Sequence, residues 1–186
     1  MRSKRSEDLE STKTIFRKYL GSYFQMSREL DPEECKAYRA SRRQRDQWAK
    51  EYFSELFELL ENSPSEAEAF KCFWMATKLL QAMIHPAESL QKLAKYAIEN
   101  KEKHDSFTQM LFAEILMCAI DDLTLSLKLS WQTKRKIKKM AVDLLTEMLE
   151  QPLQLSAETL ENELLKDASR SSAMKERIQR NLEKWS

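Results

Sequence analysis

The chain has 186 residues, with 31 lysines and arginines against 30 aspartates and glutamates, one glycine and four prolines. This balance leaves no long-range field to steer the whole molecule to nucleic acid or to a membrane. A single glycine excludes glycine-rich phosphate loops and disfavours β-hairpins, whose tight turns recruit glycine. The length suits one domain with a real core, and the composition predicts an all-α protein.

The first sixty residues carry the signals of two helices. Ser6 can cap a helix that we expect to run to about Leu30. Asp31, followed by proline and two glutamates, then begins a second helix, which we expect to reach about Glu61. The second half of this helix carries an apolar stripe typical of a core helix, and its first half carries a basic cluster: Arg39, Arg42, Arg43 and Arg45.

Two more helices are predicted before residue 102. Ser63 and Glu66 can form a capping box around Pro64, at the start of a helix that we expect to end at about Ile84. It ends there because the residue before Pro86 avoids the helical conformation. The next helix is predicted over residues 87–101. The first of the two carries these predicted core residues: Phe70, Phe73, Trp74, Ala76, Leu79, Leu80 and Met83.

The segment FTQMLFAEILMCAI, residues 107–120, is apolar almost all the way round, which predicts a helix enclosed by others. Asp105 and Ser106 can cap its start. It is shorter than the roughly 20 residues that span a bilayer. Its only charged residue, Glu114, must be paired, hydrogen-bonded or protonated, or must occupy the one wet position at a rim. An enzyme centred on Glu114 is the least favoured of three functional hypotheses.

The segment DDLTLSLKLS, residues 121–130, alternates leucine with Thr, Ser and Lys, which is the period of an extended strand. The sequence offers no second strand. The favoured expectation is therefore an extended crossover that presses its leucines on the helices, or a continued buried helix. The alternative is an unpaired edge that recruits a strand from a partner or a second copy.

The last third of the chain predicts three helices, over about 131–151, 157–168 and 172–185. The first is amphipathic, and its basic residues lie near its start, where positive charge opposes the helix dipole. With the tryptophan that precedes them, they form a second basic cluster: Trp131, Lys134, Arg135, Lys136, Lys138 and Lys139. The last helix has a narrow apolar stripe that suits docking on the rest of the chain or on a partner: Met174, Ile178, Leu182 and Trp185.

An internal repeat is suggested by the apolar positions. Residues 70–83 align with residues 107–120 at an offset of 37, and residues 90–98 align with residues 137–145 at an offset of 47. The ten extra residues match the length of DDLTLSLKLS. This pattern is typical of two helical hairpins of one plan.

The sequence contains no recognisable catalytic or metal-binding motif. His85 and His104 lie at predicted helix ends, outside any metal-ligand spacing, and we expect His104 to be a solvated loop residue. Cys35, Cys72 and Cys118 are an odd, widely spaced set, which indicates reduced, buried thiols. The first ten residues lack an apolar stretch, so we expect no signal peptide. Asp121 and Asp122 are a weak signal for a cation.

These patterns predict a single all-α domain of about seven to eight helices, packed as antiparallel hairpins in a bundle or a short HEAT-like stack. We expect residues 1–170 to form the domain, and residues 171–186 to form a C-terminal amphipathic helix docked on it or on a partner.

By elimination, we predict a non-enzymatic adaptor or regulatory protein in the cytoplasm, which binds another protein or a second copy and needs no cofactor, metal or membrane. The alternative is a nucleic-acid-associated factor that uses the basic clusters at 39–45 and 134–139. The predicted contact residues are Arg39, Arg42, Arg43, Trp131, Lys134, Arg135, Lys138, Lys139, Met174, Ile178, Leu182 and Trp185.

Overall fold

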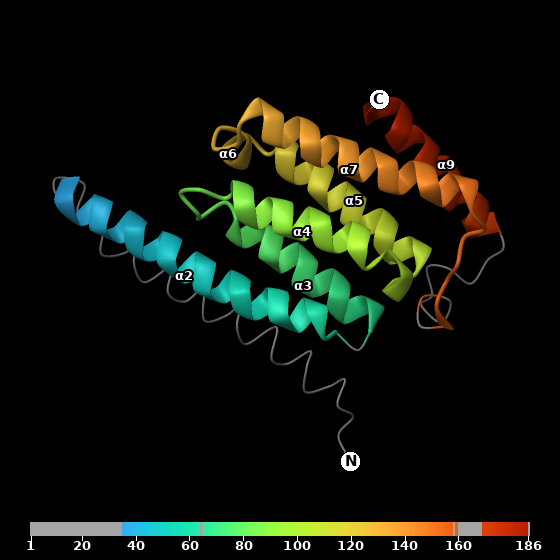
Figure 1. Cartoon of the computed structure of the whole chain (residues 1–186), viewed down its shortest axis with the longest axis horizontal. Helices are drawn as coiled ribbons and strands as arrows, with labels where there is room; N and C mark the ends of the chain where they lie inside the picture. Colours follow the sequence, from blue (N-terminus) through green and yellow to red (C-terminus); the bar gives the residue numbers. More distant parts are fainter. Residues whose placement is uncertain (1–34, 64, 158, 160–168, 186) are drawn as a thin grey trace, which may run out of the picture. The chain divides into compact units, whose positions relative to one another are not determined.

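The computed structural model of the chain describes residues 35–63, 65–157, 159 and 169–185. Every regular element among them is a helix and none is a strand, so the predicted all-α class is confirmed for this part of the chain (Figure 1). The helix predicted over residues 6–30 and most of the one predicted over 157–168 lie outside the described residues. None of the described helices is long and apolar enough to cross a membrane.

The chain divides into two compact units, Met1–Pro86 and Ala87–Ser186. The predicted boundary at residue 171 does not coincide with this division. The described part of the first unit contains α2 (Cys35–Glu61) and α3 (Glu66–Leu79), which pack along each other. Their contact buries apolar side chains from both helices: Phe53, Leu56, Phe57, Leu60, Cys72, Phe73, Ala76 and Leu79.

Helix α3 begins later than predicted. Its N-cap is Ser65, whose hydroxyl accepts a hydrogen bond from Glu68 N at 3.2 Å. The predicted cap, Ser63, instead donates to the carbonyl of Leu60 at 3.0 Å at the end of α2. The sequence holds two overlapping Ser-x-x-Glu patterns, and the second one forms the cap.

Helix α3 also ends five residues earlier than predicted. After Leu79, tight turns carry the chain through residues 80–83, with three-residue hydrogen bonds such as Met83 N to Leu80 O at 3.2 Å. The N–H of Ile84 then donates to the carboxylate of Asp46 on α2 at 2.6 Å. A tertiary hydrogen bond therefore replaces the last helical turn. Trp74, which we predicted to be buried, is exposed beneath the Lys78 ammonium, 5.7 Å from its ring centre.

Asp46 is the buried charge that holds this loop on α2. Its other carboxylate oxygen accepts a hydrogen bond from Lys50 Nζ at 2.7 Å. Burial raises the pKa of Asp46, while the hydrogen bonds from Lys50 and Ile84, and the charges of Lys50 and His85, lower it. The net result is a pKa below its ordinary value of 3.8. The ionised form is therefore favoured by folding.

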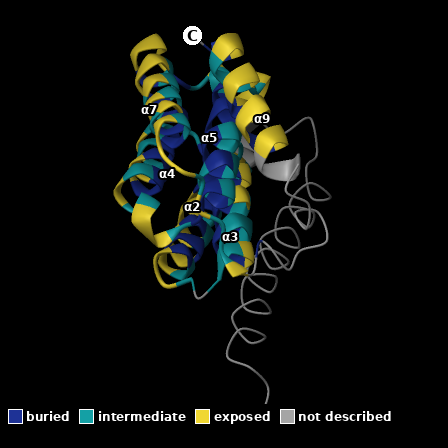
Figure 2. Ribbon diagram, turned by 90° about the vertical axis from the view of Figure 1, so that its right-hand side faces the viewer, coloured by how far each residue is buried: buried dark blue, intermediate teal, exposed yellow. Residues whose placement is uncertain are grey.

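The second unit contains α4 (Ala87–Glu99), the 3-10 turn η1 (Lys101–Lys103), α5 (Ser106–Asp121), α6 (Leu123–Ser126), α7 (Trp131–Glu150) and α9 (Ser169–Trp185). Helix α5 contacts α4, α6 and α7, and α7 also contacts α4 and α9. Burial is concentrated on α5, which confirms the predicted enclosure of residues 107–120 (Figure 2).

Asp105 fixes the start of α5, as predicted. One of its carboxylate oxygens accepts from Thr108 N at 2.8 Å and caps the helix. The other accepts from Ser156 N at 3.1 Å, from Ser156 Oγ at 3.0 Å and from the Thr159 hydroxyl. This buried carboxylate therefore ties the start of α5 to the segment that follows α7.

We predict that Asp46→Asn lowers the free energy of unfolding of the first unit by about 1 to 3 kcal/mol at pH 7, because a charged acceptor is lost. The folded pKa lies below the unfolded one, so the unfolded chain takes up its proton first as the pH falls. The difference between wild type and variant should therefore be full at pH 7, and it should shrink as the pH falls below about 4 and through the folded pKa.

Urea unfolding at pH 7 and at a pH below about 4 measures the difference in the free energy of unfolding between wild type and Asp46→Asn. Asp143→Asn is the matched control, since Asp143 is an exposed acid on α7. An Asp46→Asn difference that is the same at both pH values would contradict the assignment.

Candidate functional site

Helices α5 and α6 meet at Asp122, which completes one and begins the other. Its N–H donates to the carbonyl of Cys118 at 2.9 Å and ends α5, and its carboxylate accepts from Leu125 N at 3.0 Å and caps α6. The weak cation signal of the two aspartates thus falls on a helix joint. Within the described ranges, no group of three or more His, Cys, Asp or Glu residues is placed to hold a metal ion.

The leucine-rich insert begins with a short helix and continues in turns, so the predicted extended crossover and edge strand are wrong, and the alternative of a continued buried helix holds in part. Residues 123–126 form α6, and turns follow, with Lys128 N bonded to Leu125 O at 2.9 Å. Residues two apart on a helix point about 200° apart, so the leucines must divide between two faces. Leu125 and Leu129 are buried, with 1% and 7% exposed, whereas Leu123 and Leu127 are 75% and 80% exposed.

Trp131, the first residue of α7, is 69% exposed. It lies four positions after Leu127, so the two Cα atoms are at most about 14 Å apart. The hydroxyl of Ser130 caps α7 by accepting from Thr133 N at 3.1 Å, which fixes the turn between the two helices. We name Leu123, Leu127 and Trp131 the corner residues, because all three lie where α6 turns into α7.

Basic side chains adjoin the corner residues. The Arg135 guanidinium lies over the Trp131 ring, 5.3 Å from its centre. Lys134 Nζ donates to the Ser126 hydroxyl at 2.6 Å and so joins the first turn of α7 to α6. Lys139 is exposed and Lys138 is half-buried. Residues 121–139 hold six lysines and arginines against two aspartates, so this segment is basic although the chain as a whole is nearly neutral.

The other basic cluster belongs to the first unit. Arg42 and Arg43 are exposed on α2, Arg45 is half-buried, and the side chain of Arg39 lies outside the described residues. The two clusters therefore lie on different units of the chain.

Glu114 is a paired carboxylate that joins α5 to α9. Arg177 donates two hydrogen bonds to it, from Nε to Oε1 at 2.7 Å and from Nη2 to Oε2. Asn181 Nδ2 also donates to Oε1 at 2.7 Å. The Glu114 side chain is 16% exposed. Glu114 therefore meets both expectations: it is a paired carboxylate, and it lies at the rim of the core, where part of it reaches solvent.

The narrow stripe of α9 lies mostly inside its own unit. Met174, Ile178 and Trp185 are buried and Leu182 is half-buried, while the opposite side of the helix is exposed (Figure 2). Helix α9 packs against α7. The four stripe residues are thus occupied by contacts within the chain.

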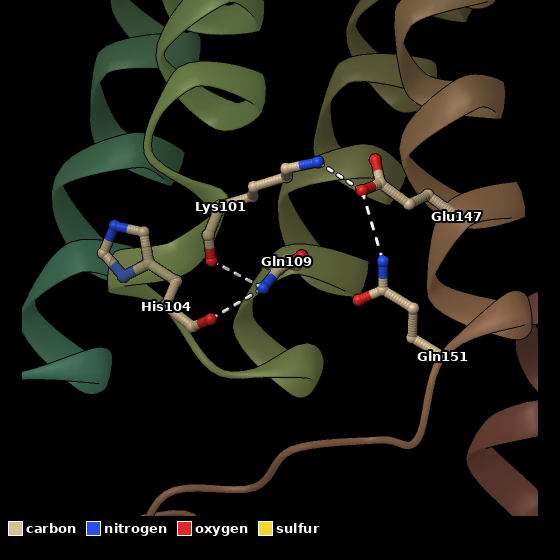
Figure 3. Close-up of polar contacts among 5 residues, drawn as sticks. All are labelled: Lys101, His104, Gln109, Glu147 and Gln151. Carbon is tan, nitrogen blue, oxygen red and sulfur yellow. Dashed lines mark hydrogen bonds and ion pairs between the residues drawn. The ribbon is translucent and has the colours of Figure 1, made fainter.

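A pocket of about 350 Å³ lies among η1, α5, α7 and the segment after α7. Figure 3 shows its polar groups facing one another. Lys101 pairs with Glu147, to which Gln151 Nε2 also donates at 3.4 Å. Gln109 Nε2 donates to the carbonyls of Lys101 and His104 at 2.7 and 2.6 Å. These contacts hold the three elements together.

His104 lies in the loop that follows η1, as predicted, but it is half-buried, so its expected solvation is wrong. Its Nε2 lies 2.8 Å from the hydroxyl of Tyr96, and its ring packs edge-on against Phe112 at 5.2 Å. The His104 ring therefore contacts side chains of both α4 and α5. No signal in the sequence marks this partnership, because Tyr96 and Phe112 come from two different helices.

The thiols differ from prediction in one case. Cys72 is buried as expected, whereas Cys118 is exposed on α5. The side chain of Cys35 lies outside the described residues. The neighbours of Cys118, Met117 and Ala119, are buried. Cys118 lies in the last turn of α5, on the side of the helix that faces solvent.

Comparison with protein-family models, with curated proteins and with solved structures finds no match to this chain. The strongest functional signal in the described residues is then the exposed apolar and basic corner. Trp131, Lys134 and Arg135 were predicted as contact residues, whereas Leu123 and Leu127 were not. Their helical geometry, which divides alternating leucines between two faces, is the signal that would have found them.

We predict that Glu114→Gln frees α9, because it removes the charge that Arg177 grips and leaves a weaker acceptor for Asn181. Amide hydrogen exchange across residues 169–185 should quicken by about tenfold, which corresponds to a loss of about 1.4 kcal/mol. Glu183→Gln, on an exposed residue of the same helix, should leave exchange unchanged. Equal protection in all three proteins would show that the Glu114 contacts do not hold α9.

Proposed function

We propose that this chain is a non-enzymatic adaptor or regulatory protein, and that it contacts a protein partner through the corner residues of α6 and α7. One observation carries the proposal: Leu123, Leu127 and Trp131 are all largely exposed within nine residues of chain. Burying one leucine fully is worth about 1.5 to 3 kcal/mol. Burying these two leucines and the tryptophan against a partner would therefore stabilise the complex.

The chemistry of the corner supports a protein partner over nucleic acid. Leu123 and Leu127 gain free energy from apolar side chains and little from phosphate groups. Nucleic acid binding through the basic clusters remains the second candidate. The observation in its favour is the exposed Trp131 ring beneath Arg135, since base stacking on aromatic rings and cationic contacts support single-strand binding.

The finer architecture is part of the same proposal. We propose antiparallel helical hairpins, supported by the packing of the sequential pairs α2 with α3 and α4 with α5. The suggested internal repeat has less support than the hairpins, because residues 80–83 form turns while their counterparts, residues 117–120, are helical. A reducing, cytoplasmic setting accords with the free thiols Cys72 and Cys118.

A photo-crosslinking experiment tests the proposed contact. A benzophenone side chain replaces Leu127 in one protein and Lys175, an exposed residue of α9, in a control. Both are irradiated in cells that produce the chain. We expect protein adducts from position 127 that are absent or much weaker from position 175.

Nuclease and protease treatment then identify the adduct. Adducts that survive nuclease and shift with protease support the proposal. Adducts lost on nuclease treatment would favour the second candidate, and equal or absent adducts at both positions would contradict a contact at the corner. Unfolding of Leu127→Ser should differ from wild type by no more than about 0.5 kcal/mol, since the side chain is exposed.

A further inference from the structure

The charge around the corner residues indicates what kind of protein surface fits there. We infer that the partner segment is an acidic amphipathic helix, whose apolar side chains cover Leu123, Leu127 and Trp131 and whose carboxylates meet the basic residues at the start of α7. This inference rests on the proposed function and specifies its partner.

The cations of the corner are placed to select acids. Residues 121–139 carry six cations and two aspartates, and the carboxylate of Asp122 is engaged in capping α6. The Arg135 guanidinium lies over the Trp131 ring, 5.3 Å from its centre, so its charge lies beside an exposed apolar side chain. An acid on the partner could pair with it at the edge of an apolar contact, where partial desolvation strengthens ion pairs.

The backbone of the corner favours a helical partner over an extended one. Extended peptides bind by adding a strand to an open sheet edge. The described residues contain no strand, and the backbone groups around the corner are engaged in helices and turns. A partner must therefore satisfy its own backbone, and a helix does so while presenting an apolar stripe beside a charged one.

A second copy of the chain fits the corner poorly in a two-fold dimer. Such a dimer places the same surface of both copies face to face. The exposed cations Arg135 and Lys139 of one copy would then lie near those of the other, and like charges brought together cost free energy. A membrane surface also fits poorly, because interfacial helices bury a long apolar face and α6 spans four residues.

A synthetic peptide tests the inference on the full chain. The probe is a fluorescein-labelled 20-residue helix with leucines at three- and four-residue steps and glutamates beside them. Controls are a scrambled peptide of the same composition and a peptide with lysine in place of each glutamate. We expect anisotropy titrations to show the acidic helix binding at least about tenfold more tightly than either control, and more weakly as salt is raised.

Variants of the chain locate the binding. The double substitution Leu123→Ser with Leu127→Ser should weaken binding at least about tenfold, and Arg135→Glu should weaken it at least about fivefold. Lys175→Glu is the matched charge control and should bind as wild type does. Circular dichroism checks that each variant is folded, which the exposure of all four positions predicts.

Three results would overturn the inference: the lysine peptide binds as tightly as the acidic one, the corner variants bind as wild type does, or a uridine 20-mer or phosphatidylserine vesicles bind in preference to the acidic peptide. Protein adducts at position 127 without peptide binding would reject the acidic helix and leave the proposed function standing. Absence of both would reject the two together.

Discussion

The hydrogen bonds of Asp122 are the constraint on which the candidate site depends. By accepting from Leu125 N, this carboxylate starts a new helical turn where α5 ends. A helical turn cannot bury four alternating leucines, since residues two apart point about 200° from one another. Leu125 and Leu129 therefore complete the core of the second unit, and Leu123 and Leu127 are left in solvent. The apolar corner follows from one cap and from the geometry of the helix.

The sequence predicted the helical class, the enclosed helix at 107–120 and the cap at Asp105, because these depend on local pattern and composition. At the insert the expected extended crossover and edge strand were wrong, and the expected continued buried helix was right only in part, because all four leucines were assumed to share one buried face. Over so few residues, the periods of strand and helix are hard to separate. The error was to assume that every leucine is buried. Leucines that form an interaction surface are exposed in the free chain.

Long-range contacts account for the other differences between sequence and structure. Helix α3 ends at Leu79 because Asp46, 38 residues before Ile84, captures the Ile84 N–H. Glu114 is paired because Arg177 reaches it from 63 residues away. His104 is half-buried because Tyr96 and Phe112 enclose it. No local pattern carries this information, since each partner looks like an ordinary helix residue on its own.

Thiol labelling of four cysteine variants tests the helical insert most directly. Leu123→Cys, Leu125→Cys, Leu127→Cys and Leu129→Cys are each made with Cys118→Ser, which removes the exposed thiol among the described residues, and with Cys35→Ser. In the native protein, positions 123 and 127 should react rapidly, at least about tenfold faster than positions 125 and 129, because the helix divides them between two faces. Similar rates at all four positions would indicate an extended strand with one leucine face, and would contradict the corner surface.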